Sequence, residues 1–178
     1  MDNQIIFAGF GGQGILSMGR FIAHAGLHEG KHVSWLPSYG PEMRGGTANC
    51  NVIVSDEEVG SPIVSAATAL VVMNQPSLEK FESYVEPGGV IILDSDLVPV
   101  RPARTDVRVF AVPATKMAYD MGNPTFAGVI LLGKLLKETG VVRTDSFEAA
   151  LKGILKPKKH YLIPDEMKAL ECGARYAC

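Results

Sequence analysis

The residues with the clearest chemical potential are Gly9–Gly14, which read Gly-Phe-Gly-Gly-Gln-Gly. They satisfy the G-x-G-x-x-G pattern between an apolar run over Gln4–Gly9 and an amphipathic run over Gly14–His28, which predicts a strand, a tight turn and a helix. The backbone N–H groups of such a turn and the positive end of the helix dipole can hold an anion. Alternatively, the glycines only permit the turn and close helix–sheet packing. The candidate binding residues here are Gly9, Gly11, Gly12, Gln13 and Gly14.

Two common nucleotide chemistries fit this turn poorly. A nicotinamide dehydrogenase needs an acidic residue at the end of the second strand for the ribose hydroxyls, and Val33–Pro37 contains none. A phosphate-binding P-loop needs Lys-Ser/Thr after the last glycine, where this chain has Ile15 and Leu16. These residues argue against ATP hydrolysis and weaken the alternative of a stand-alone dinucleotide-binding oxidoreductase.

A second group of polar residues, Ser38–Thr47, follows the second expected strand and should lie near the same edge of the sheet. Arg44, followed by two glycines, can present its guanidinium group and neighbouring N–H groups to a carboxylate or phosphate. Glu42 could orient it, although a solvated loop with a weak surface Arg–Glu pair explains the same residues. The candidate binding residues in this segment are Ser38, Tyr39, Arg44, Gly45 and Gly46.

Other reactive side chains do not form a recognisable catalytic or metal site. His24 and His28 are spaced i, i+4 without the acidic residue of a zinc helix, which favours a pair on the helix surface. Cys50, Cys172 and Cys178 include no Cys-x-x-Cys pair, so this chain alone cannot assemble a disulfide framework or an iron–sulfur site. We therefore predict no catalytic nucleophile and no metal ligand.

Hydrophobic periodicity predicts a single three-layer, Rossmann-like α/β domain over residues 1–178, with a mostly parallel, mixed sheet of about six strands and C-terminal helices. Alternation over Ala48–Val54 indicates an antiparallel strand. Pro87–Gly89 is read as a turn before a strand at Val90–Leu93, and Tyr119 as a core residue. The other expected strands are Gln4–Gly9, His32–Leu36, Ala69–Met73 and Val107–Val112, and the expected helices are Gly14–His28, Pro76–Tyr84, Thr115–Met121, Phe126–Lys137, Thr144–Ile154 and a last one within Pro164–Cys178.

Composition narrows the class of protein. The chain has 178 residues, of which 47% are hydrophobic and 20% charged, as in an ordinary globular protein. A net charge of −2 gives no broad attraction for nucleic acid. The N-terminal residues contain no basic region, and no apolar run reaches the roughly 18 residues of a membrane span, so we expect a cytoplasmic protein.

The glycine turn followed by Ser38–Gly46 resembles the gamma subunit of the 2-oxoacid:ferredoxin (acceptor) oxidoreductases. Pro87–Gly89 before a strand ending in Asp94, and the Asn123-opened helix with its small residues, are also similar to that family, so the resemblance covers nearly the whole chain. Its length and lack of fused domains look most like the 2-oxoglutarate-type subunit, and pyruvate- and branched-chain-type relatives share the pattern.

The resemblance implies a thiamine-diphosphate-dependent oxidative decarboxylation, in which a 2-oxoacid and coenzyme A become acyl-CoA and CO₂ and electrons pass to ferredoxin or another low-potential acceptor. Thiamine diphosphate and the iron–sulfur clusters would sit on partner subunits (alpha, beta and a ferredoxin-like delta), because this chain has no thiamine-binding motif and no cluster cysteines. The chain would dock on those subunits, contact coenzyme A, and be inactive alone. A purely structural interaction module is the remaining alternative.

Overall fold

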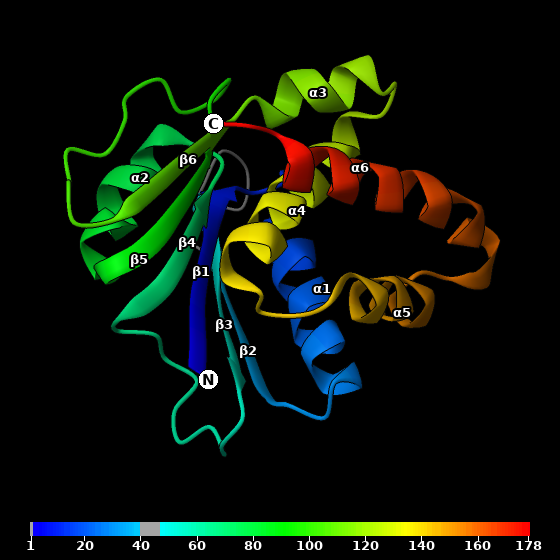
Figure 1. The fold of residues 1–178 in the computed structure, drawn as a ribbon, viewed down its shortest axis with the longest axis horizontal. Helices are drawn as coiled ribbons and strands as arrows, with labels where there is room; N and C mark the ends of the chain where they lie inside the picture. The colour runs from blue at the N-terminus through cyan, green and yellow to red at the C-terminus, as the bar shows by residue number, and fades with distance from the viewer. Residues whose placement is uncertain (1, 40–46) are drawn as a thin grey trace.

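A six-stranded sheet forms the centre of the computed structural model, which describes residues 2–39 and 47–178 (Figure 1). The strand order is β2-β3-β1-β4-β5-β6. Strands β1, β4, β5 and β6 are parallel, and β3 is antiparallel to both β1 and β2, which confirms the mixed sheet and the antiparallel strand predicted at Ala48–Val54. The strands are β1 (Asp2–Phe10), β2 (His32–Tyr39), β3 (Thr47–Ser55), β4 (Ala67–Val72), β5 (Val85–Asp94) and β6 (Arg108–Val112).

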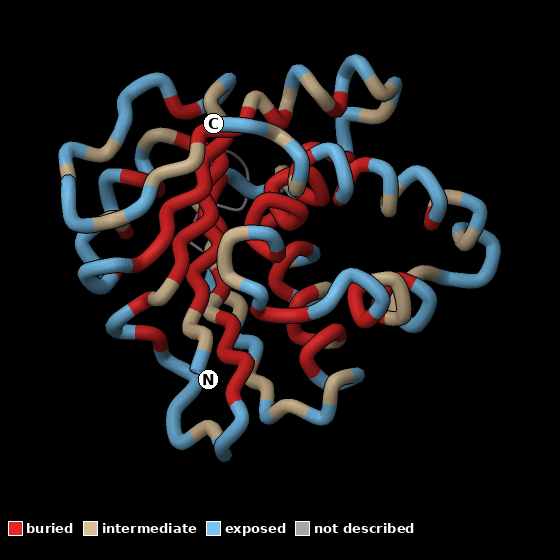
Figure 2. The backbone as a smooth tube through the Cα atoms, in the orientation of Figure 1, coloured by how far each residue is buried: buried red, intermediate tan, exposed pale blue. Residues whose placement is uncertain are grey.

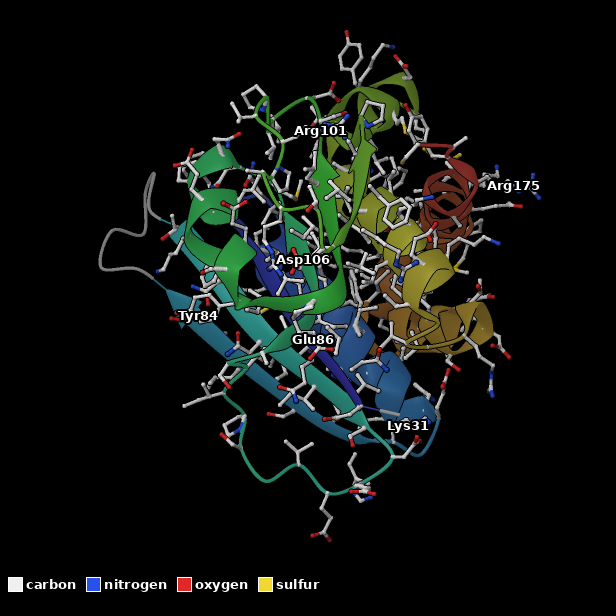
Figure 3. The ribbon with its side chains drawn as sticks, turned by 60° about the vertical axis from the view of Figure 1, so that its left-hand side comes forward. Lys31, Tyr84, Glu86, Arg101, Asp106 and Arg175 are labelled. Carbon is white, nitrogen blue, oxygen red and sulfur yellow. The ribbon has the colours of Figure 1, made fainter. Side chains whose placement is uncertain are left out.

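Helices cover both faces of the sheet, which confirms the three layers. Helix α2 lies on one face, and α1, α4, α5 and α6 lie on the other (Figure 1). In Figure 3, Tyr84 beside α2 and Arg175 on α6 mark these opposite sides. The helices are α1 (Ile15–His28), α2 (Gln75–Phe81), α3 (Ala114–Asp120), α4 (Ala127–Thr139), α5 (Thr144–Ile154) and α6 (Ile163–Arg175), with short 3-10 turns η1 (Glu82–Tyr84), η2 (Pro124–Phe126) and η3 (Pro157–Leu162).

Burial on both faces explains why the central strands are continuously apolar. In β1, Ile5 and Phe7 pack in the larger core under α1 and α4, whereas Ile6 and Ala8 pack in the smaller core under α2. Successive strand residues point to opposite faces of the sheet. When helices cover both faces, both sets of side chains are buried, so apolar residues do not alternate with polar ones. The buried strands in the middle of the molecule are visible in Figure 2.

Helices α4 and α6 pack very closely where they cross, because a glycine on each helix faces the backbone of the other. A Cβ atom added at Gly133 would lie 1.9 Å from the Leu170 carbonyl oxygen, and one at Gly173 would lie 1.7 Å from the Ile130 carbonyl oxygen. Any larger residue would push the helices apart. This crossing fixes α6, and with it one wall of the larger hollow described in the next subsection.

Two expectations from the sequence were wrong. Pro87–Gly89 lie inside β5, where the register against β4 shifts and Gly88 adopts a φ of 82°. The segment is an irregularity of the strand, and the Gly88 N–H donates to the Asp106 carbonyl at 2.7 Å. Tyr119, expected in the core, is 76% exposed on α3, whereas Phe126 is buried as predicted.

No helix within residues 2–39 and 47–178 is both long enough and apolar enough to cross a membrane.

Candidate functional site at the carboxyl edge of the sheet

The connections of the sheet create a crevice between the ends of β1 and β4. The chain leaves β1 through α1, which covers one face and leads to β2, whereas it leaves β4 through α2, which covers the other face and leads to β5. In open α/β sheets, ligands bind where neighbouring strands diverge in this way. Arg101, after β5, lies toward this edge in Figure 3, and Lys31, after α1, lies toward the opposite edge.

The glycine turn occupies this crevice, and its glycines are required for different reasons. Gly12 and Gly14 have φ values of 91° and 79°, in the left-handed region where other residues are strained. A Cβ atom at Gly9 would lie 2.5 Å from Gln13 Oε1 and 2.7 Å from Ile15 Cδ1, so a larger residue there would have to displace these two side chains. The sequence pattern therefore reflects both backbone conformation and close packing.

Gln13 fixes the turn from within. Its Oε1 accepts a hydrogen bond from the Phe10 N–H at 2.7 Å, and its Nε2 donates to the Met73 carbonyl at 3.0 Å. Met73 directly follows β4, so this side chain spans the crevice between β1 and β4. Both ends of the Gln13 amide are therefore used to hold the loop. Gln13 can affect binding through the backbone N–H groups that it positions.

The start of α1 presents N–H groups that have no partner within the helix and could bind an anion. Gly14 is the N-cap, has no side chain to accept from the first turn, and is followed by no acidic residue in that turn. The first N–H groups of a helix have no partner within the helix, and the helix dipole adds positive potential there. Gly11, Gly12, Gly14 and Ser17 are also exposed, so a ligand can reach these groups.

Two hollows adjoin the turn. The smaller, of about 300 Å³, lies between Phe10–Gly12, the first turn of α1 and Ala48 on β3. The larger, of about 610 Å³, runs from the turn along α1 and α4 toward η3 and α6. Residues of the larger hollow include Gly12, Gln13, Gly14, Met18, Phe21, Met73, Gly128, Val129, Leu155, Lys159, Leu162 and Glu166.

Ser38 and Tyr39 lie at the same edge as the glycine turn, as predicted. They are the last two residues of β2, where Tyr39 pairs with Ala48 of β3, and Ala48 pairs in turn with Gly9 of β1. Ser38 is exposed. Arg44, Gly45 and Gly46, together with Glu42, lie outside the described residues, so their part in the site stays a prediction.

Other polar residues at this edge have structural roles. Asn74 caps α2 by accepting from the Ser77 N–H at 2.8 Å. Asp94 ends β5, is fully buried, and accepts from both the Thr115 N–H and its hydroxyl, at 3.1 and 2.6 Å. Burial raises the pKa of the Asp94 carboxyl, while the hydrogen bonds from Thr115 oppose that shift. These contacts anchor α3 to the sheet.

The cysteines do not fit an iron–sulfur cluster. Cys50 lies in the core, its thiol donates to the Ile15 carbonyl at 3.6 Å, and burial raises its pKa to about 12, which opposes formation of a thiolate ligand. Cys172 and Cys178 are exposed on α6 and the segment after it. Within the described part of the chain, no three His, Cys, Asp or Glu side chains come together as metal ligands.

Sequence reasoning missed two charged residues of the larger hollow. Lys159 belongs to a basic stretch that is typical of a solvated turn, and Glu166 belongs to a Pro-Asp-Glu helix start. Glu166 Oε2 is nevertheless buried and has no hydrogen-bond partner among the described residues, and burial raises the pKa of this carboxyl to about 7. Only the packing of α6 against α4 reveals that Glu166 lines the larger hollow.

The chain is similar in sequence to subunits of known oxidoreductases. A profile of the family described as "Pyruvate ferredoxin/flavodoxin oxidoreductase" matches residues 4–176. Ketoisovalerate oxidoreductase subunit VorA of Methanothermobacter thermautotrophicus is 42% identical over 98% of this chain, which spans only 36% of that longer relative. The 2-oxoglutarate synthase subunit KorC of Methanocaldococcus jannaschii is 34% identical over 85% of this chain and 82% of its own length.

A solved structure shares the fold over nearly the full length. The gamma subunit of a keto/oxoacid ferredoxin oxidoreductase from Geobacter sulfurreducens superposes with a TM-score of 0.80 at 31% identity, covering 96% of this chain and 95% of that one. The sheet and helices described above are therefore the architecture of that gamma subunit.

Proposed function

The chain belongs to the pyruvate ferredoxin/flavodoxin oxidoreductase family, as its motifs predicted, and we propose that it is the gamma subunit of a 2-oxoacid:ferredoxin oxidoreductase complex. The complex would convert a 2-oxoacid and coenzyme A to acyl-CoA and CO₂ and pass the electrons to ferredoxin or another low-potential acceptor. The observation that carries this proposal is the family match over residues 4–176, which includes the glycine turn.

The side chains of this chain indicate which cofactors of the complex belong to other subunits. The buried thiol of Cys50 and the separated Cys172 and Cys178 do not fit a cluster, and the sequence has no thiamine-diphosphate motif. Thiamine diphosphate and the clusters are therefore assigned to the alpha, beta and ferredoxin-like delta subunits. This subunit docks on them and is inactive alone.

Its own contribution is to hold the phosphates of coenzyme A. The N–H groups of the exposed residues Gly11, Gly12 and Gly14, and those of the first turn of α1, offer fixed positive dipoles to an anion. The end of β2 brings Ser38 and Tyr39 to the same edge, and Arg44, a few residues farther along the chain, would add a charge. No group on the chain is assigned as acid, base or nucleophile.

We propose two 2-oxoacids as substrates of the complex, the better supported one first. The first is 2-oxoglutarate, which the sequence resemblance favours and for which the KorC relative is named. The second is a branched-chain 2-oxoacid, because the 42% identical relative is named a ketoisovalerate oxidoreductase subunit.

The test is to purify the tagged subunit from its native cells without oxygen and to assay dye reduction with 2-oxoglutarate, ketoisovalerate and pyruvate. We expect larger subunits with thiamine diphosphate and clusters to copurify, and dye reduction to require both a 2-oxoacid and coenzyme A. A subunit that elutes alone and is inactive with all three acids would contradict the proposal. Binding of NAD(P) or FAD by that isolated chain would favour the stand-alone oxidoreductase instead.

A further inference from the structure

A separate groove lies between the start of α5 and the length of α6, and we call it the α5–α6 groove. It has a volume of about 490 Å³, and α4 lies beneath it. Both helices are on the side of the sheet opposite α2 (Figure 1). Along α6 the lining runs from Pro164 to Ala174, which corresponds to about 15 Å at the helical rise of 1.5 Å per residue. The groove is therefore elongated, with the length of about three helical turns.

The floor of the α5–α6 groove is apolar. Leu136 of α4, Val142 before α5 and Leu170 of α6 form it, and all three belong to the larger core. Met167 of α6 is only partly buried above this floor. A methionine side chain adapts its shape to different neighbours and is common at binding surfaces. The floor thus offers apolar contact to the side chains of an occupant.

The charged side chains of the α5–α6 groove are mostly cations. Lys137, Arg143 and Lys168 line it, against the single carboxylate of Glu171, which already pairs with Arg175. Lys137 belongs to no ion pair among the residues that the structure describes. Three cations from three different elements therefore surround an apolar floor.

Two of these cations have weak partners outside the groove. Arg143 pairs with Asp145 at 3.3 Å and Lys168 with Asp165 at 3.7 Å, and neither aspartate lines the groove. All four side chains are more than half exposed, so these pairs contribute little to stability. Both cations can therefore turn toward an anionic occupant at small cost.

We propose that the α5–α6 groove receives an acidic amphipathic helix from one of the partner subunits. Its apolar side chains would lie on the floor, and its carboxylates beside Lys137, Arg143 and Lys168. The inference rests on the proposed function, in which this chain docks on other subunits. It adds the place of one contact and the chemistry of the segment that makes it.

The length, floor and charge of the groove favour this occupant. Amphipathic helices bind in apolar grooves through side chains three and four residues apart, and about three turns of helix match the lining of α6. Positive charge at the edges complements carboxylates and disfavours a basic segment. A two-fold contact between two copies of this chain would bring the same cations together, which opposes that arrangement.

The test is to purify the tagged subunit from its native cells without oxygen, unaltered and as two double variants. Lys137→Glu with Lys168→Glu reverses two exposed charges of the groove. Lys152→Glu with Lys158→Glu is the matched control, because these exposed lysines lie outside the groove and the change in net charge is equal. We expect the groove variant to lower the recovery of one larger subunit per tagged chain about 10-fold, and the control to change it less than about 2-fold.

A cross-link identifies the occupant. A photo-reactive benzoylphenylalanine at the position of Thr144, an exposed residue of the groove, should cross-link to that same larger subunit. The cross-linked peptide should carry Asp or Glu beside apolar residues three and four apart.

Equal recovery with the two double variants would overturn this inference while the proposed function stands. A cross-link to a second copy of this chain, to a peptide without acidic residues, or to no protein would also overturn it. If no larger subunit copurified with the unaltered chain, the proposed function would fail and this inference with it.

Discussion

Gln13 shows how a polar residue in a binding motif can act on the backbone. Both ends of its amide bond to main-chain groups, one within the turn and one after β4. The groups that we propose to hold an anion are N–H groups of the loop, and their positions depend on this side chain. Its sequence position made it a candidate ligand residue, and the structure supplies the physical route by which it would affect a ligand.

We predict that Gln13→Ala lowers the free energy of unfolding by about 1–3 kcal/mol, because two hydrogen bonds are lost and the Phe10 N–H loses its acceptor. The KM of the complex for coenzyme A should also rise. Gln75→Ala is the control, since Gln75 bonds to both main-chain groups of Val100 in a comparable way beside α2. It should affect unfolding in urea and leave the KM unchanged; an equal KM effect in both variants would contradict the assignment.

Glu166 makes the stability of the chain depend on pH. Burial raises the pKa of its carboxyl from 4.5 to about 7, so the folded state favours the neutral form. Below pH 4.5 the group is neutral in both states and its full contribution is present. As the pH rises toward 7 the unfolded chain ionises first, and stability is lost.

Glu166→Gln removes this titration, so we predict that the variant is more stable than the unaltered chain by about 1–2 kcal/mol at pH 8 and no more stable at pH 4.5. Partial exposure of the side chain makes the difference smaller than the shift in pKa alone implies. Urea unfolding between pH 4.5 and pH 8 measures it. Parallel stability curves for the two proteins would show that Glu166 titrates normally.

At the scale of elements, contact between α4 and α6 depends on Gly133 and Gly173, each of which faces a carbonyl oxygen of the other helix. These glycines are unfavourable for helix propensity. This cost in helix stability is offset by the packing of α4 against α6, which lie closer together than any residue with a Cβ atom would allow. The position of α6, which carries Glu166, follows from this crossing.

We predict that Gly173→Ala destabilises the chain by about 3 kcal/mol, through displacement of α6. Gly153→Ala on α5 is a matched control, because nothing lies within 4 Å of a Cβ atom added there. That variant should be neutral or more stable by about 0.5–1 kcal/mol. Thermal unfolding of both variants checks the pair, and equal shifts in Tm would mean that the crossing is not tight.

Most elements were predictable because hydrophobic periodicity reflects local burial. The order of strands and helices along the chain and the antiparallel β3 agree with the sequence patterns. The failures arise from neighbours that the local sequence does not contain. Pro87–Gly89 carry a turn signal and instead form an irregularity of β5 between the paired residues Val85 and Val90, where the Gly88 N–H donates to the Asp106 carbonyl. Tyr119 has helical spacing, but it lies on the exposed face of α3.

At the scale of the whole molecule, the candidate site combines a local motif with distant residues. The glycine turn was predictable from six consecutive residues, and its edge of the sheet was predictable because the turn directly follows an expected strand. The larger hollow was not predictable, because it forms between α1, α4 and α6, which are far apart in the sequence. Lys159 and Glu166 have ordinary local contexts, and only tertiary packing buries Glu166.

The central claim is that the turn at the start of α1 holds the phosphates of coenzyme A. The most direct measurement is the KM of the purified complex for coenzyme A in Gly12→Ala and Gly30→Ala variants. Both glycines have positive φ, 91° and 71°, and both have open space where a Cβ atom would lie. Each substitution therefore costs about 1–2 kcal/mol of backbone strain, at the two opposite ends of α1.

We predict that Gly12→Ala raises the KM for coenzyme A about 10-fold or more and that Gly30→Ala changes this KM less than about 2-fold. Both variants should lower Tm by about the same amount. Equal KM values in the two variants would contradict the claim.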